Sequence, residues 1–174
     1  MNHYNTFWQR VGAALIDGMA LGLLVFLAKL ILNLYTNESE IVGRLLDNIF
    51  YFCYSFYLHG RFGQTFGKMA FSIKVVLHDD ESQAIGFHNA FKRESVWIFL
   101  TAISYIPVFR DLSFVDSITF FWFLAEIITM LFNEKRRAVH DYLANSVVID
   151  IRSYTKWEQS FYTEQKIKPE SNDQ

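Results

Sequence analysis

A long apolar stretch near the N-terminus limits this chain to a membrane environment. From Val11 to Tyr35 the sequence reads VGAALIDGMALGLLVFLAKLILNLY, in which only Asp17 and Lys29 are charged at neutral pH. A helix of this length can cross a hydrocarbon core of about 30 Å. A carboxylate inside such a span costs about 2.5–3.5 kcal/mol to insert, so it usually faces protein or water. We therefore expect a membrane protein that holds polar groups inside it.

Four apolar segments follow one another along the 174 residues, which are 52% hydrophobic and 20% charged. They are Val11–Tyr35, Ile41–His59, Val96–Phe109 and Ser117–Phe132. The third is short for a span and has Pro107 near its end, so it either re-enters the membrane or recruits Phe87–Ser95 as an amphipathic lead-in. The predicted fold is an all-α membrane protein with a four-helix transmembrane bundle over residues 1–152 and a mobile polar tail over 153–174.

The basic residues predict the orientation of these segments. Of the 16 Lys and Arg residues, five lie in the long polar stretch Gly60–Ser95 and seven follow Phe132. The short connections hold one base, Arg110. By the positive-inside rule, both termini and residues 60–95 are expected in the cytoplasm. No basic face or stripe indicates a nucleic-acid partner.

Two segments have the alternation that is typical of β-strands. Phe71–Leu77 (FSIKVVL) and Asn145–Ile151 (NSVVIDI) are rich in β-branched residues. Each directly follows a basic stretch on the predicted cytoplasmic side. We expect them to pair into a small sheet under the membrane.

Three motifs together resemble a known family. They are Trp8–Asp17 (WQRVGAALID), Gly63–Val76 (GQTFGKMAFSIKVV) and Arg136–Val148 (RRAVHDYLANSVV). In this order, over roughly residues 7–150, they resemble the RDD family of bacterial membrane proteins, named for an arginine and two aspartates. Asn145-Ser146 departs from the family pattern, where Gly-Thr is expected.

The resemblance assigns the arginine to Arg10, the first aspartate to Asp17 and the second to Asp141. It implies a polytopic protein of the bacterial inner membrane. Most members have no known function, and cation/proton antiport has been proposed for some.

Arg10 and Asp141 are expected at the same membrane surface. Arg10 is at the cytoplasmic entrance of the first span, and Asp141 follows the last span as it returns to the cytoplasm. The favoured interpretation is a clamp that joins the first helix to the C-terminal segment. Alternatively, Arg10 extends to the phosphate level of the membrane as an anchor.

Two acids are expected at the same depth in the membrane. Asp17 and Glu126 each lie six residues from the inner end of their spans, about 9 Å below the surface. If the two helices touch, one acid should hold a proton or share a cation, because two like charges are costly in a low dielectric. Alternatively, each acid forms hydrogen bonds separately with backbone or polar neighbours.

In the outer half of the membrane, three charged residues are expected to lie close together. Lys29 and Asp47 both lie about 9 Å from the outer surface, and Arg44 shares a helix face with Asp47. These three could offset one another's insertion cost. Extension of Lys29 and Arg44 to the outer surface is equally compatible with the sequence.

Two functions remain open, and enzymatic activity is not expected. The first is a membrane-embedded interaction or assembly module with unidentified protein partners. The second is a cation/proton antiporter that uses Asp17 and Glu126, for which four helices would require a homo-oligomer. The sequence has no nucleophile–base signature, and its five histidines lack the spacing of a haem or zinc site, so no cofactor or metal is predicted.

Overall fold

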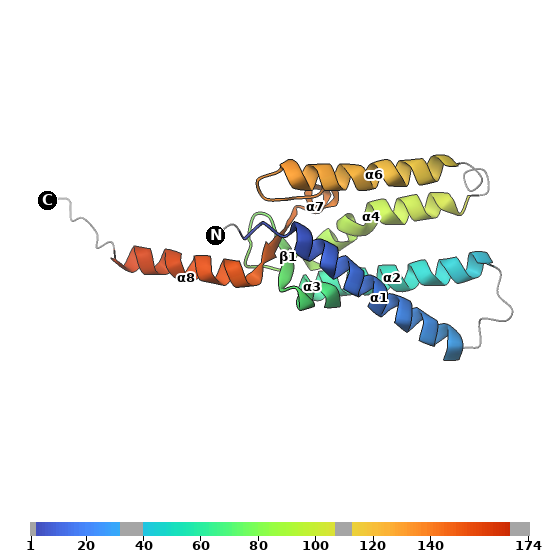
Figure 1. Ribbon diagram of the computed structural model, residues 1–174, viewed down its shortest axis with the longest axis horizontal. Coiled ribbons are helices and arrows are strands. Elements are labelled where there is room, and N and C mark those ends of the chain that lie inside the picture. Colours follow the sequence, from blue (N-terminus) through green and yellow to red (C-terminus); the bar gives the residue numbers. More distant parts are fainter. Residues whose placement is uncertain (1–2, 32–39, 107–112, 168–174) are drawn as a thin grey trace.

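Four long helices extend from one small base of short helices and two strands (Figure 1). The computed structural model describes residues 3–31, 40–106 and 113–167. The long helices are α1 (Phe7–Ile31), α2 (Glu40–Phe62), α4 (Gly86–Ser104) and α6 (Ser113–Phe132). The predicted helical fold with a small β element is therefore confirmed at this level.

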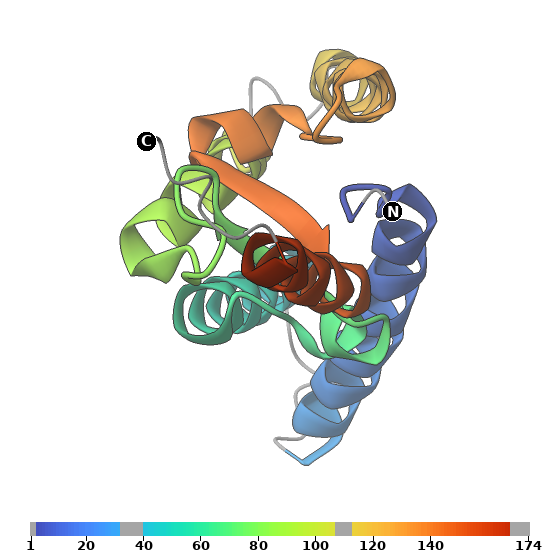
Figure 2. The same cartoon turned by 90° about the vertical axis from the view of Figure 1, so that its left-hand side faces the viewer.

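The base contains the paired strands that the sequence predicts. Its elements are α3 (Phe66–Ala70), β1 (Ile73–Leu77), α7 (Val139–Leu143) and β2 (Ser146–Asp150). The two strands are antiparallel, with Val75 opposite Val148. Seen from the base in Figure 2, β2 runs from α7 toward α1. The β-branched residues of both strands suit this buried, pleated arrangement.

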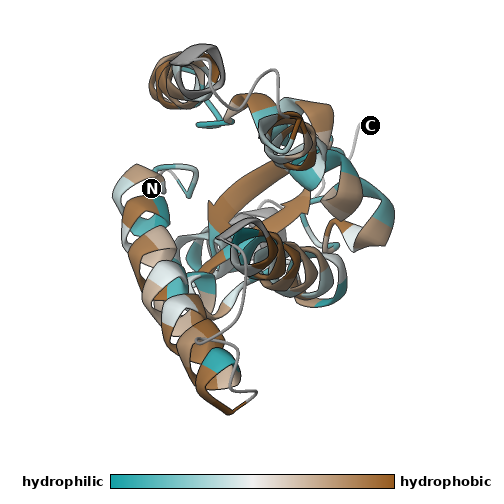
Figure 3. Cartoon of the chain, turned by 90° about the vertical axis from the view of Figure 1, so that its right-hand side faces the viewer, coloured by the Kyte–Doolittle hydropathy of each residue, from teal (hydrophilic) through white to brown (hydrophobic). Residues whose placement is uncertain are grey.

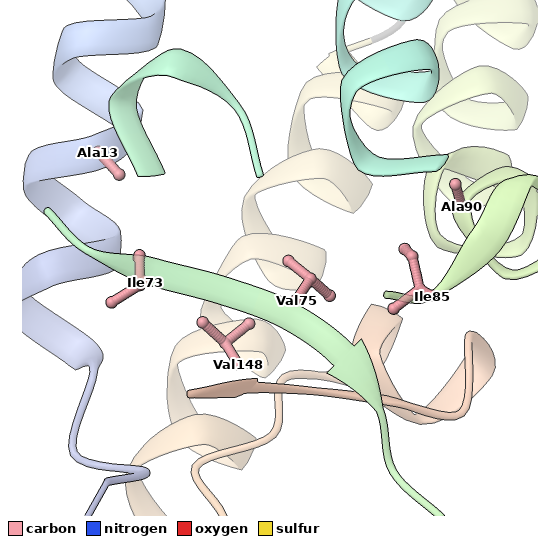
Figure 4. Packing of buried hydrophobic residues seen from close by; sticks show 6 residues of the cluster. All are labelled: Ala13, Ile73, Val75, Ile85, Ala90 and Val148. Atoms are coloured by element: carbon pink, nitrogen blue, oxygen red, sulfur yellow. The ribbon is translucent and has the colours of Figure 1, made fainter. Parts of the chain in front are cut away.

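The apolar core lies at the base. Figure 4 shows Ile73 and Val75 of β1 with Val148 of β2 in one cluster, and Ala13 of α1 and Ala90 of α4 complete it with Ile85. On the other face of the sheet, a second cluster packs against Tyr4 and Tyr154. Both faces of the sheet are thus covered, which ties the N-terminal and C-terminal segments to one core.

Apolar residues recur along the long helices (Figure 3). On α6, Phe120, Phe121 and Phe123 are each more than half exposed. Among the described residues, α1 is the one helix both long and apolar enough to cross a membrane, and Ser117–Phe132 is a shorter apolar helix. A core helix of a soluble protein would bury such side chains, whereas hydrocarbon favours them.

The third helix differs from its predicted bounds. It begins at Gly86 rather than Val96, so the proposed lead-in Phe87–Ser95 is continuous with the rest of α4. The physical reason is that Ala90, Arg93 and Glu94 of this first half are buried against the base and α2. Predicted residues 107–109 of this span, like 32–35 of the first, lie outside the described residues.

The C-terminal segment, which was predicted as a polar tail, is helical in its described part. Helix α8 (Ile151–Ile167) follows β2 directly, and the Asp150 carboxylate accepts a hydrogen bond from the Arg152 N–H at 2.9 Å. The rings of Tyr154 and Trp157 pack against His3. These aromatic contacts at helical spacing order a sequence that composition alone describes as polar. Residues 168–174 lie outside the described residues.

Candidate functional site

A layer of buried polar side chains lies where the long helices meet the base. It contains Asp17, Ser55, His59, Thr65, Arg93, Glu94, Glu126 and Asp141, together with Arg10, whose side chain is 11% exposed. These residues come from all four long helices, from α7 and from the start of α3. We call this set the polar layer. Buried charges are tolerated when they are paired and hydrogen-bonded, so the partners define what the layer does.

Asp141 joins three helices through its carboxylate. The Arg10 Nη1 group donates to Asp141 Oδ2 at 2.7 Å, and Arg93 Nη1 donates to Oδ1. The Ala138 N–H also donates to the carboxylate, at 3.0 Å. Burial by itself would raise the pKa of Asp141, but the charges of Arg93 and Arg10 outweigh it and hold the pKa well below its usual range. The carboxylate is therefore charged at neutral pH and links α7 to α1 and α4.

The guanidinium of Arg10 points into the base. Besides Asp141, it donates to the Thr6 hydroxyl at 3.2 Å and to the Arg136 carbonyl at 3.0 Å. The structure thus brings Arg10 and Asp141 together, as the clamp interpretation requires, and directs Arg10 away from the anchoring position. Sequence reasoning missed Arg93, which it counted only as a marker of the cytoplasmic side.

Asp17 holds α3 against α1. Its carboxylate accepts from the hydroxyls of Tyr54 and Thr65, each at 2.6 Å, and from the Gly67 N–H at 2.7 Å. A side chain at Gly67 would come within 2.1 Å of the Ala13 carbonyl oxygen, so only glycine permits this close approach. The carboxylate thus satisfies the Gly67 N–H, which is one of the first N–H groups of that helix.

Glu126 pairs with α7 and not with Asp17. One carboxylate oxygen of Glu126 lies 2.7 Å from His140 Nδ1, and the other accepts from the His140 N–H at 3.2 Å. Among the described residues, the acid pair predicted from equal depth is not formed, and the alternative of separate hydrogen bonds holds. Equal depth does not fix which way two helices face, and Asp17 and Glu126 are each directed to a different element of the base.

A further cluster, which sequence reasoning missed, joins α2 to α4. The Ser55 hydroxyl donates to Glu94 Oε1 at 2.5 Å, and His59 Nδ1 lies 3.4 Å from the same oxygen. Lys68 is half-buried nearby, and burial and then the charge of Arg93 lower its pKa to about 8. A helix-spaced signal exists in the sequence, because Ser55 and His59 are four residues apart on one face.

The outer-half cluster is present in part. Lys29 Nζ lies 2.6 Å from Asp47 Oδ1, which joins α1 to α2. Asp47 is 46% exposed and Lys29 18% exposed. Arg44 lies one turn before Asp47 on α2, as predicted.

The polar layer joins the helices to one another, because its charged groups contact hydrogen-bond donors or acceptors on other elements. In the part of the chain that the structure describes, no group of three or more His, Cys, Asp or Glu residues could hold a metal ion. Asp141 and Glu126 bind α7 to α1, α4 and α6, while Asp17 and Glu94 bind α2 to its neighbours.

The same residues agree with the comparison to known proteins. No curated protein and no solved structure matches this chain. Residues 4–145 match the model of the RDD family, a span that includes Arg10, Asp17 and Asp141 and covers most of the sequence. The resemblance found in the motifs is confirmed, and the chain belongs to the RDD family.

Proposed function

We propose that this RDD-family membrane protein is a four-span assembly module that positions α8 in the cytoplasm for a protein partner. The observation that carries the proposal is the polar layer, in which buried charges fasten the long helices to a cytoplasmic base. A base fixed in this way holds α8 in one direction relative to the membrane.

Four spans are supported by geometry and charge together. The long helices leave the base in the same direction, and α8 leaves it in the opposite direction (Figure 1). The apolar side chains are exposed along the long helices, whereas ionic clusters lie at the base. With the base inside, most basic residues lie in the cytoplasm, which agrees with the positive-inside rule.

Helix α8 is the element best placed to meet a partner. Its first turns are held by His3, but the side chains from Thr155 to Gln159 are exposed. In the part of α8 whose side chains the structure describes, Tyr154 and Trp157 contact His3, and the exposed side chains offer a surface for contact with a partner. A second copy of this chain is one such partner, and an unrelated membrane or cytoplasmic protein is another.

Cation/proton antiport through Asp17 and Glu126 is the less supported function. Asp17 already accepts three hydrogen bonds, and Glu126 is engaged by His140. A transport site requires a carboxylate that can exchange its partners for water or a cation. Breaking these bonds would also undock α3 or α7.

Site-specific photo-crosslinking in membranes tests the proposal. A photoreactive residue in place of Lys156 or Glu158 on α8 should give one discrete crosslinked species, and its mass distinguishes a second copy from another protein. The control position is Ser82, which is exposed on the base. Equal crosslinking from Ser82 and α8, or none from either, would contradict the proposal.

A further inference from the structure

A lateral cavity between α2 and α4 has a composition that the assembly function does not explain. It has a volume of about 660 Å³. Its aromatic lining consists of Tyr51, Phe52, Phe91, Trp97 and Tyr105. Glu94 is the one charged side chain among the lining residues that the structure describes. A carboxylate in the lining of an aromatic cavity is unusual, because a purely apolar ligand has no group that interacts favourably with its charge.

The geometry of Glu94 leaves one oxygen for a ligand. Both of its polar contacts, with the Ser55 hydroxyl and with His59 Nδ1, fall on Oε1. Arg93, its neighbour in sequence, directs its guanidinium to Asp141. The Glu94 carboxylate is therefore oriented by neighbours on α2, while the ion pair that the Arg93 guanidinium forms is with Asp141.

Two of the lining residues form a neutral hydrogen bond with each other. The Asn48 amide donates to the Tyr105 hydroxyl at 2.8 Å. Thr101 and Ala102 line the wall between this contact and the aromatic residues. The cavity thus has one charged end beside the polar layer and an uncharged body on the apolar flank of the long helices.

We propose that this cavity binds a lipophilic cation, with the positive charge at Glu94 and the apolar groups against the aromatic side chains. The faces of aromatic rings attract cations, and the attraction is stronger where water is excluded. A lipophilic anion would be repelled by Glu94. A neutral lipid chain would bring no positive charge to Glu94, so it would gain nothing from the carboxylate. This inference is independent of the proposed function, since it uses neither α8 nor a protein partner.

Equilibrium dialysis of the full-length protein in detergent provides the test. The probes are tetraphenylphosphonium and tetraphenylborate, which share size and shape and carry opposite charges. After subtraction of uptake by empty micelles, the protein should bind the cation at least about tenfold more tightly than the anion. Glu94→Gln should remove this preference. Glu126→Gln, which changes an equally buried acid of the polar layer, should retain it.

If Glu94→Gln unfolds, a second variant and the unmodified protein still test the inference. Ala102→Trp fills the cavity from an exposed position outside the polar layer and should abolish cation binding while the protein stays folded. Equal binding of both probes by the unmodified protein would overturn the inference, as would cation binding that Ala102→Trp leaves unchanged.

Discussion

Asp141 occupies the most constrained position among single residues, because its fully buried carboxylate lies between two guanidinium groups. Pairs of this kind gain little over apolar packing when both partners are present. Removal of one partner is costly, since it leaves a buried charge without compensation. The carboxylate therefore enforces one arrangement of α1, α4 and α7 rather than adding a large net stability.

A double-mutant cycle on Arg10 and Asp141 tests this coupling. Arg10→Gln and Asp141→Asn should each lower the free energy of unfolding in detergent by about 3–5 kcal/mol, because each strands a buried partner. The double variant should lose less than the sum of the two. Asp79→Asn, at a carboxylate 73% exposed, is the control and should have little effect. Strict additivity of the two losses would show that the contact is not coupled.

The acid limit of stability should also depend on Asp141. Its folded-state pKa is held well below its usual range by Arg93 and Arg10 against the effect of burial. A carboxyl group whose pKa is lowered by folding stabilises the protein at pH values above its pKa in the unfolded chain, which is about 3.9. This stability is lost as the pH falls toward the pKa of the folded state. In pH titrations of thermal unfolding, Asp141→Asn should flatten the fall in stability below about pH 4. If Asp141→Asn loses stability with falling pH as steeply as the unmodified protein does, Asp141 is not the cause of that loss.

Several residues of the polar layer could be predicted from the sequence, and others could not. Arg10, Asp17 and Asp141 stand out because charges at span ends and within spans are rare. Arg93 and Glu94 were hidden in a polar stretch, where charges are ordinary. Whether Asp17 meets Glu126 could not be read from the sequence, because depth gives the height of a residue on its helix and not the direction it faces.

At the scale of elements, the docking of α3 on α1 depends on a close backbone approach. Gly67 lies over the Ala13 carbonyl, and the carboxylate of Asp17 accepts the Gly67 N–H. The strands and the existence of the long helices were predictable from periodicity. The start of α4 and the helical state of α8 were not, because both depend on tertiary contacts of polar segments.

Two glycine-to-alanine substitutions distinguish the effect of this close approach from the general effect of such a substitution in a helix. Gly67→Ala places a methyl group against backbone, which cannot move aside, and should lower the free energy of unfolding by about 1–3 kcal/mol. Gly18→Ala is the matched control on α1, since a methyl group there meets nothing within 4 Å. Denaturation in detergent would measure both. A Gly67→Ala variant as stable as Gly18→Ala would refute the docking role.

At the scale of the whole molecule, charge and apolar surface are separated along the long axis. The buried ion pairs of Asp141 and the half-buried ion pair of Glu81 with Lys135 are at the base, while exposed apolar side chains cover the long helices. Among the described residues, Lys29 and Asp47 form an ion pair farther along the bundle. This separation is the reason for assigning the base to the cytoplasm.

Cysteine labelling in intact cells tests that orientation. In a Cys53→Ser background, Ser82→Cys at the base should resist an impermeant thiol reagent until the cells are opened. Ile106→Cys, at the opposite end of α4, should react in intact cells. Both positions are exposed, so access is set by the membrane. Labelling of Ser82→Cys from outside would reverse or remove the proposed topology.

The central claim is that the buried acids hold the fold together and do not carry ions. Proton and sodium flux in proteoliposomes under an imposed pH gradient tests it most directly, with the unmodified protein compared with Asp17→Asn and with empty liposomes. The account predicts no flux above that of empty liposomes for either protein, and a lower thermal stability for Asp17→Asn because α3 loses its anchor. Flux through the unmodified protein that Asp17→Asn abolishes would contradict the account.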